Sequence, residues 1–214
     1  MWTHLIVDLD NTLYSARTGV FDLVDARIQS FLTERLRIPD AQARALRVRW
    51  MSRFGTTLRG LRLYFPDVDP MEFMDYAHDI PLEAFLQPMP ELRSVLQTIP
   101  VRRVIFSNSD RKHTVRVLEL LGIADLFDGW ITIEDLGMIP KPNWEAYATL
   151  VRRLHLIPSR SLYVDDLMRN VRMGHRWGFQ CIWVHDGKAP TGRLAPRLVG
   201  IRSILDLPEG LMFL

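Results

Sequence analysis

Short apolar runs alternate with helical segments along most of the chain, and this alternation restricts the fold more than any other feature of the sequence. Strands joined by helices are typical of a parallel sheet with right-handed crossovers and helices on both faces. We therefore predict an α/β fold with a Rossmann-like parallel sheet. The predicted strands lie at residues 5–7, 103–107, 130–133, 161–165, 180–184 and 198–201, and the helices between them at residues 91–98, 110–121, 142–155 and 167–177. Asp110 is expected to cap one of these helices, and Pro142 to open another.

The segment between the first two predicted strands carries helical signals and no strand signal. Apolar residues from Val20 to Leu32 recur at helical spacing, and Asp40 is expected to cap a helix that ends near Phe54. Residues 58–65 predict a short helix. The run Asp69-Pro70-Met71-Glu72 predicts another helix start, because it combines an N-cap, a proline at the first helical position and an acid at the third.

This helical segment interrupts the α/β pattern directly after the first strand. In open α/β sheets, ligands bind at the carboxyl ends of the strands, so an insertion at that edge would lie over the ligand as a cap. We predict a core domain of residues 1–14 and 88–214, with residues 15–87 forming an inserted α-helical cap domain.

The composition is that of a folded protein with a substantial core, since 48% of the 214 residues are hydrophobic and 24% are charged. The formal net charge is +2, and the arginines are scattered among acids instead of forming a basic run. These features argue against a nucleic-acid polymer as a partner.

The sequence gives no indication of secretion or of membrane insertion. No apolar run approaches the about 20 residues that a spanning helix needs, and no signal peptide is visible before the first strand. The single cysteine, Cys181, excludes an internal disulfide and is interpreted as a buried strand thiol. We expect a cytoplasmic protein without membrane partners, acting as a monomer or a weak homodimer.

Two carboxylates follow the first apolar strand. Asp8 and Asp10 are separated by one residue, so strand periodicity would place them on the same side of the chain. Neighbouring carboxylates repel each other and need a cation or a shared proton, and a divalent ion would supply the cation. The alternative is a pair of solvated acids in a turn.

Three further polar motifs fall where predicted strands end or helices begin. Ser107-Asn108 would offer a hydroxyl and free backbone N–H groups to a phosphate, unless it is ordinary turn polarity. Lys141 lies at a helix start, which favours anions, so it would reach a carboxylate or phosphate unless it is solvated. Asp165-Asp166 is, like the first motif, a pair of acids at the end of an apolar strand, with helix capping as the alternative interpretation. Asn170 follows about one helical turn later.

In order and spacing, these motifs resemble those of the haloacid dehalogenase superfamily of phosphatases. The first motif of that superfamily is Asp-x-Asp followed by Thr or Val, matched here by Asp8-Leu9-Asp10-Asn11-Thr12. Its strand-end Ser or Thr is matched by Ser107, its lysine by Lys141, and its acidic pair by Asp165-Asp166. The resemblance covers nearly the whole chain.

A narrower resemblance is to the branch of this superfamily that contains the pyrimidine 5′-nucleotidases. That branch often has Thr where this chain has Ser107, and both residues carry the hydroxyl. The similar stretches are residues 8–14, Gly55-Thr56-Thr57-Leu58-Arg59-Gly60-Leu61, residues 78–82, Phe106-Ser107-Asn108 through His113, and residues 121–129.

The resemblance implies hydrolysis of a phosphomonoester through an aspartyl-phosphate. Asp8 would be the nucleophile, and Asp10 would protonate the leaving group and then deprotonate the attacking water. Burial at the core edge and the charge of Asp8 are expected to raise the pKa of Asp10 for this role. Ser107 and Asn108 would bind the phosphoryl group, and Lys141 would offset its charge.

The resemblance also implies Mg²⁺ as the cofactor, because the site offers oxygen ligands alone. The metal ligands would be the carboxylates of Asp8 and Asp165 and the backbone carbonyl of Asp10. Asp166 would order a metal-bound water or hold the lysine. Asn170 would likewise support the metal ligands without binding the metal itself.

The cap would exclude bulk water and select the leaving group. Arg59 is expected to contact the substrate, with a solvated helix-face arginine as the alternative. His113 is interpreted as structural. The expected substrate is a nucleoside 5′-monophosphate, with pyrimidines favoured.

Three alternative functions stay open at this point. The first is a phosphatase for another small ester, such as phosphoglycolate or a sugar phosphate, since the fold does not fix the substrate. The second is a true haloacid dehalogenase, against which Asp10 and Asp165 argue, because that chemistry needs neither a metal nor this general acid. The third is a non-catalytic phospho-ligand-binding protein, against which the presence of every expected catalytic residue argues.

Overall fold

The strands form one seven-stranded sheet in the order β3-β2-β1-β4-β5-β7-β6. The structure is a computed structural model that describes residues 1–185, 187 and 190–214. Neighbouring strands are parallel throughout, except for the antiparallel pair of β6 with β7. This confirms the prediction of a Rossmann-like α/β fold. The strands are β1 (His4–Val7), β2 (Arg102–Phe106), β3 (Gly129–Ile131), β4 (Ser161–Asp165), β5 (Gln180–Val184), β6 (Gly192–Ala195) and β7 (Leu198–Ile201).

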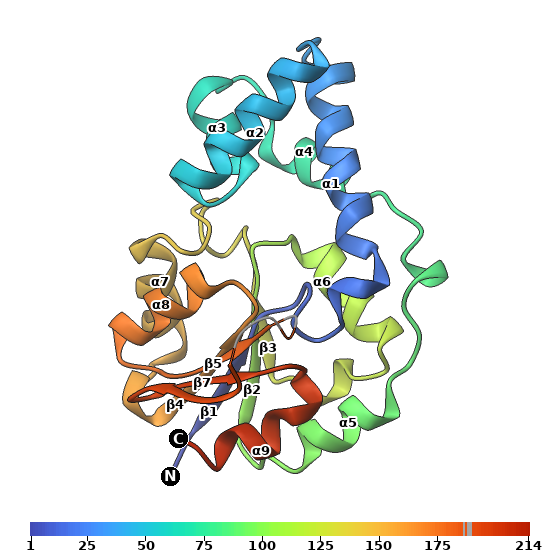
Figure 1. The fold of residues 1–214 in the computed structure, drawn as a ribbon. Coiled ribbons are helices and arrows are strands. Elements are labelled where there is room, and N and C mark those ends of the chain that lie inside the picture. The colour runs from blue at the N-terminus through green and yellow to red at the C-terminus, as the bar shows by residue number, and fades with distance from the viewer. Residues whose placement is uncertain (186, 188–189) are drawn as a thin grey trace.

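Alternate residues of each strand pack against helices on opposite faces of the sheet. Leu5 and Val7 belong to an apolar core with α5 (Pro90–Gln97), α6 (Arg111–Leu120) and α9 (Leu207–Leu211). Ile6 belongs to the core on the other face, as does Cys181 of β5. The helices α7 (Trp144–Leu154) and α8 (Met168–Trp177) cover this face. Figure 1 shows the two groups of helices on either side of the sheet. The two-residue repeat of the strands therefore produces a three-layered core.

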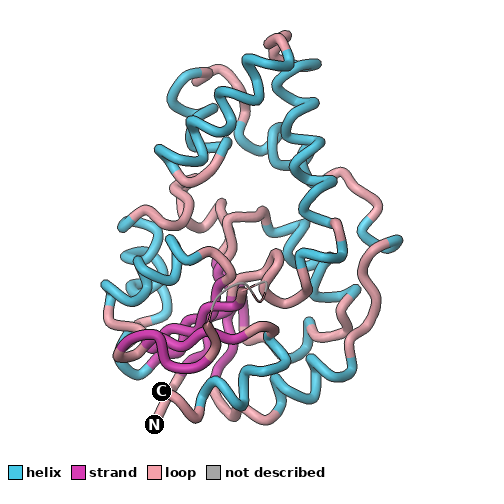
Figure 2. The backbone as a smooth tube through the Cα atoms, viewed as in Figure 1, coloured by secondary structure: helices cyan, strands magenta, loops and turns pink. Residues whose placement is uncertain are grey.

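Between β1 and β2, the α-helices other than α5 form a segment that extends beyond this sandwich, although Val20 and Val24 at its start and Leu82 after its end pack into the core of the sheet. We call α1 (Val20–Ser30), α2 (Asp40–Phe54), α3 (Thr57–Tyr64) and α4 (Pro70–His78) the inserted helices. A π-helical stretch at Phe31–Arg35 follows α1. Figure 2 shows that this end of the molecule contains helices and loops, while the strands lie at the other end. The inserted helices have a separate apolar core that includes Phe31, Trp50 and Phe73.

The capping predictions were right at two helices and wrong at two. Asp69 accepts a hydrogen bond from the Met71 N–H, and Asp110 accepts one from the His113 N–H, as N-caps do. Asp40 is instead the first residue of α2, and its carboxylate accepts from Arg44 Nε at 2.8 Å. The helix α7 begins two residues after Pro142, at Trp144.

The tail contains one strand more than the sequence predicts. The predicted strand at residues 198–201 is present as β7. The missed strand, β6, is a short edge strand of mostly partly exposed residues, Gly192 to Ala195, which has neither an apolar run nor an alternating pattern. Among the described residues, no helix combines the length and apolarity needed to cross a membrane.

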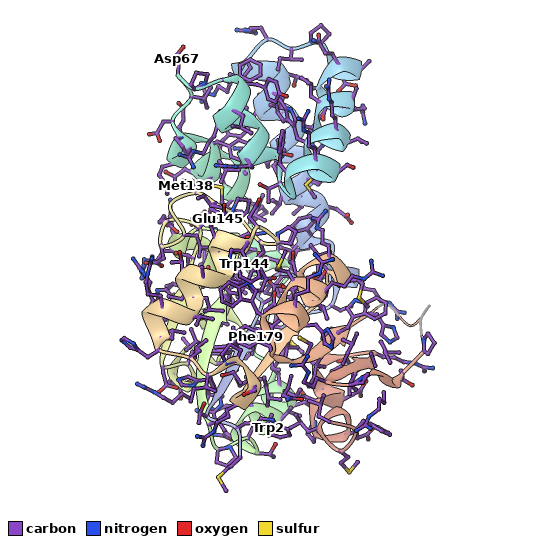
Figure 3. All side chains as sticks on the ribbon, turned by 90° about the vertical axis from the view of Figure 1, so that its left-hand side faces the viewer. Trp2, Asp67, Met138, Trp144, Glu145 and Phe179 are labelled. Carbon is purple, nitrogen blue, oxygen red and sulfur yellow. The ribbon has the colours of Figure 1, made fainter. Side chains whose placement is uncertain are left out.

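Arginine side chains connect the inserted helices with the core by donating hydrogen bonds to main-chain carbonyls. Arg169 of α8 donates to the Gly55 carbonyl at 3.1 Å, and Arg62 of α3 donates to the Met138 carbonyl at 3.2 Å. Figure 3 shows Met138 at this junction, with Asp67 near the far end of the inserted helices. A Cβ on Gly55 would lie 2.8 Å from Pro142 Cδ, so only glycine permits this approach. The domain limits at residues 14/15 and 87/88 stay a prediction.

Candidate active site

The predicted strand-end motifs meet because β2, β1 and β4 are adjacent and parallel. Asp8 follows β1, Ser107 follows β2, and Asp165 ends β4. The Asp8 N–H extends the ladder by donating to the Val164 carbonyl at 2.9 Å. The three motifs, which are far apart in sequence, therefore lie together at the carboxyl edge of the sheet.

Lys141 is the cation of this edge and is fully buried. Its Nζ donates to Asp8 Oδ1 at 2.7 Å, to Asp165 Oδ2 at 2.9 Å and to the Phe106 carbonyl at 2.6 Å. Burial acts to lower the pKa of Lys141, but the charges of Asp165 and Asp8 outweigh it and hold the pKa above its usual value. The lysine is therefore a permanent positive charge in contact with the expected nucleophile, and the solvated alternative is wrong.

Three carboxylates converge beside this lysine. Asp8, Asp165 and Asp166 each offer one oxygen, and these oxygens lie within 4.8 Å of one another. Burial raises the pKa of Asp8 and Lys141 lowers it. With the added charge of Asp165, burial outweighs the lysine, and the pKa is raised to about 7. Burial and the charges of Asp8 and Asp165 raise the pKa of Asp166 to about 9. A divalent cation would relieve this repulsion, and a set of oxygen donors fits Mg²⁺.

The two acids of the pair have different surroundings. Asp165 is fully buried, and it accepts hydrogen bonds from the Tyr163 hydroxyl at 2.6 Å, the Leu167 N–H at 2.8 Å and Asn170 Nδ2 at 3.0 Å, besides Lys141. Asp166 faces the cavity described below, and no other described residue donates a hydrogen bond to its carboxylate. Among the described residues, Asp166 is therefore the acid whose carboxylate oxygens have no donor, whereas both oxygens of Asp165 are engaged.

Asp10 is held by three donors. Its Oδ1 accepts from the Tyr14 hydroxyl at 2.6 Å and from His113 Nε2 at 2.8 Å, and its Oδ2 accepts from the Ser109 hydroxyl at 2.6 Å. Burial acts to raise the pKa of Asp10, but His113, Ser109 and Tyr14 outweigh it and hold the pKa well below its usual range. The expectation of a raised pKa is wrong, because donors that lie far away in the sequence stabilise the carboxylate.

His113 is more than a structural residue of α6, because it contacts Asp10 directly. Its ring stacks on His78 of α4, with centroids 4.1 Å apart, and His78 Nδ1 is bonded to Asp110. Burial acts to lower the pKa of His113, and Asp10 outweighs it, so the pKa is raised. This stack connects the end of the inserted helices with the carboxylate of Asp10.

Ser107 and Asn108 lie at the edge as predicted, but their side chains have local partners. Ser107 Oγ accepts from the Ser109 N–H at 2.9 Å. Asn108 Oδ1 accepts from the Lys141 N–H at 2.7 Å, and Asn108 Nδ2 donates to the Lys141 carbonyl at 3.2 Å. The Asn108 side chain therefore positions the lysine, and its second amide hydrogen and the Ser107 hydroxyl hydrogen stay available to an anion.

A cavity of about 200 Å³ lies between this edge and the inserted helices. The core side presents Asp8, Asp10 and Asp166, and the Gly55–Leu58 segment closes part of the opposite side. Arg59 does not line this cavity, although the preceding Thr57 and Leu58 do, and its side chain makes no hydrogen bond with another described residue. The structure thus does not bring Arg59 to the other predicted site residues.

Several contacts escaped the sequence analysis. Thr12 donates to Asp8 Oδ2 at 2.9 Å, and Tyr14 donates to Asp10; both donors lie four residues after their acceptors, a spacing that could have indicated them. Ser109 and His113 lie about 100 residues from Asp10, so no local pattern reports these contacts. Tyr163 precedes Asp165 by two residues in β4 and thus shares its side of the strand.

Comparisons with known proteins agree with this geometry. The model of a family described as haloacid dehalogenase-like hydrolase matches residues 2–178. "Phosphate metabolism protein 8" of Saccharomyces cerevisiae is 30% identical over 190 residues, which are 78% of this chain and 59% of that protein. "(S)-2-haloacid dehalogenase 2" of a Pseudomonas species is 28% identical over 132 residues, 60% of this chain and 57% of that protein. The chain therefore spans less than two thirds of these relatives.

Among solved structures, a HAD phosphatase from Thermococcus onnurineus is similar with a TM-score of 0.64. The match covers 100% of this chain and 99% of that one at 19% identity. At this identity the likeness supports the fold alone.

Proposed function

This chain belongs to the haloacid dehalogenase-like hydrolases, and from that membership we propose that it is a Mg²⁺-dependent phosphomonoesterase that acts on nucleoside 5′-monophosphates, with pyrimidines favoured. The observation that carries the proposal is the buried Lys141 between Asp8 and Asp165, with Asp166 and Asp10 facing the same cavity. A nucleophilic carboxylate, a fixed cation and a second carboxylate for proton transfer are the parts that phosphoryl transfer requires.

In the proposed reaction, an Asp8 oxygen attacks phosphorus and the ester P–O bond breaks. Because the pKa of Asp10 is held low, the proton that Asp10 passes to the departing alkoxide would come from His113, whose ring is bonded to it and whose pKa is raised. Asp10 later takes a proton from the water that attacks the aspartyl-phosphate, which releases phosphate and restores Asp8. Lys141 offsets the charge of Asp8 and of the phosphoryl oxygens. Tyr14, Ser109 and His113 orient Asp10.

The proposed metal ligands differ in one respect from those expected from the sequence. We propose that Asp8, Asp166 and the backbone carbonyl of Asp10 hold Mg²⁺, and that Asp165 fixes Lys141 in place. The free oxygens of Asp166 and the saturated oxygens of Asp165 support this exchange of roles. When bound, the ion would stabilise negative charge on the phosphoryl group. The inserted helices would act as the cap that excludes water.

The test of the function is phosphate release from a panel of esters with Mg²⁺ and with EDTA. The panel holds UMP, CMP, dTMP, AMP, GMP, phosphoglycolate and sugar phosphates, with 2-chloropropionate added to detect dehalogenation. We expect Mg²⁺-dependent release that is fastest with pyrimidine monophosphates. Faster Mg²⁺-dependent release from another ester would keep the mechanism and refute the nucleotidase assignment. Metal-independent chloride release would refute both.

The metal assignment predicts opposite effects of Asp166→Asn in the two states of the protein. Without metal, the melting temperature should rise by a few degrees, because the variant loses a carboxylate that Asp8 and Asp165 repel. The additional rise on adding Mg²⁺, which the wild type should show, should be lost. Asp67→Asn, an exposed acid far from the site, is the matched control and should behave as the wild type.

The same measurement has a predicted pH dependence. The pKa of Asp166 is raised from 3.8 to about 9, so the metal-free folded state keeps a proton that the unfolded chain has lost between these values. The stability of the metal-free protein should therefore fall as the pH rises through this window. Mg²⁺ competes with that proton, so the shift in melting temperature on adding Mg²⁺ should grow between about pH 5 and pH 8. A pH-independent shift, or a full shift in Asp166→Asn, would contradict the assignment.

A further inference from the structure

The inserted helices place an ion pair, of which the arginine is largely buried, on the wall of the cavity that contains Asp8 and Asp10. Asp25 lies on α1 and Arg47 on α2, two helices that lie side by side, and both residues line the cavity. Arg47 Nη2 donates to Asp25 Oδ1, and Nη1 donates to Gln29 Oε1 at 3.1 Å. The Arg47 side chain is 15% exposed and that of Asp25 is 53% exposed, so the arginine is held largely away from bulk water while its partner reaches it.

The hydrogen bonds of Arg47 are incomplete. Its Nε–H is buried and has no acceptor among the described residues. Buried donors normally have a partner, because an unpaired one loses its hydration without compensation. Asn11 Oδ1, Arg169 Nε and Asn170 Oδ1 are also buried without a partner, and these residues line the same cavity from the core side. Unpaired polar atoms therefore concentrate on the walls of this cavity, as expected of a site that receives a polar ligand.

The rest of the wall on the side of the inserted helices is apolar and includes aromatic rings. A largely buried arginine in such a wall gives direction to anything that binds there. The apolar lining residues from this side are Phe21, Val24, Ile28, Met51, Leu58, Phe73, Met74 and Ala77. A flat ring with polar edges is complementary to this combination of surfaces.

We propose that Arg47 and Asp25 recognise the leaving group, and that they select a pyrimidine base through its edge. Arg47 Nε would donate to a ring carbonyl of uracil or thymine or to N3 of cytosine, and the Asp25 carboxylate would accept from the neighbouring ring N–H or from the cytosine amino group. This inference rests on the proposed phosphatase function and names the residues that set its specificity. It also transfers the role expected of Arg59 to Arg47.

Two properties of the site favour this base over other leaving groups. Asp25 neutralises Arg47, so an anionic leaving group such as a carboxylate would meet a negative as well as a positive charge. The apolar and aromatic lining on the side of the inserted helices offers a surface to the faces of a ring, which a leaving group without a ring would not use.

The experiment compares UMP with ribose 5-phosphate, which lacks the base, as substrates of the wild type and of Arg47→Met. Losing a hydrogen bond to a charged donor should lower kcat/KM for UMP by about 10- to 150-fold. The loss with ribose 5-phosphate should be smaller by about tenfold or more, because that substrate makes no contact with Arg47. Arg44→Met is the matched control: Arg44 pairs with Asp40 on the same helix, is 69% exposed and does not line the cavity. Its ratio of the two kcat/KM values should equal that of the wild type.

A second variant guards against misfolding. Arg47→Lys keeps the positive charge for Asp25 but has no Nε donor, so it should shift the substrate ratio in the same direction with an unchanged melting temperature. An unchanged ratio in both variants, or equal losses with the two substrates, would overturn the inference while leaving the phosphatase intact. A wild type that hydrolyses ribose 5-phosphate as well as UMP would do the same. A wild type without Mg²⁺-dependent activity on any ester would instead overturn the proposed function, and the inference with it.

Discussion

Asp8→Asn is expected to lower phosphate release by about four orders of magnitude or more while the protein stays folded. The amide cannot form an aspartyl-phosphate, so the route through the covalent intermediate is closed. The fold should persist because asparagine keeps the shape of Asp8 and one oxygen, which can still accept from Lys141 as Oδ1 now does at 2.7 Å. The amide nitrogen would replace Oδ2 and could donate to the Thr12 hydroxyl, which now donates to Oδ2 at 2.9 Å and can rotate to accept. The substitution also removes a charge that Asp165 and Asp166 repel.

The measurement has a kinetic and a covalent part. Steady-state release is followed with Mg²⁺, and acid-quenched samples are analysed for phosphate bound to the protein, which should appear in the wild type and be absent from the variant. Asp67→Asn serves as the control for a changed acid outside the site. Activity of Asp8→Asn within a factor of ten of the wild type would remove Asp8 as the nucleophile. So would phosphate that still becomes attached to the variant.

The catalytic edge could be predicted because each of its motifs is local. Asp8, Ser107 and Asp165 each directly follow or end a short apolar strand, and parallel strands bring their carboxyl ends to one edge. The sheet and its helices could be predicted for the same reason, because the apolar runs that mark the strands are also local patterns. Of the strands in the described part of the chain, β6 alone was not predicted, since an edge strand with few buried residues has no pattern to detect.

Contacts between distant segments account for what the sequence did not predict. The pKa of Asp10 depends on Ser109 and His113, which approach it only after β1 and β2 have paired. The choice between Arg47 and Arg59 depends on which helix face is turned toward the cavity, and both positions are arginines on helices. The domain limits, the physiological substrate and the oligomeric state stay predictions of the sequence.

Lys141→Met is expected to lower both the activity and the free energy of unfolding. Lys141 is 1% exposed, and its removal leaves Asp8 and Asp165 buried without their counter-charge. Breaking a buried ion pair from one side typically lowers the free energy of unfolding by about 3–5 kcal/mol. The fall in kcat should be about a thousandfold or more, because no other described cation contacts the nucleophile.

The pH dependence of this destabilisation distinguishes the lost charge from lost packing. Without Lys141, burial raises the folded-state pKa of Asp8 further above its unfolded value of 3.8, so the variant loses stability as the pH rises from about 4. The difference in unfolding free energy from the wild type, measured by urea denaturation without metal, should therefore be larger near pH 8 than near pH 5. Lys112→Met is the matched control, since Lys112 pairs with Asp75 on the surface and should show little difference at either pH. A difference that is the same at both pH values would mean that Lys141 stabilises the fold through its packed side chain, and that its charge is not what holds the two carboxylates together.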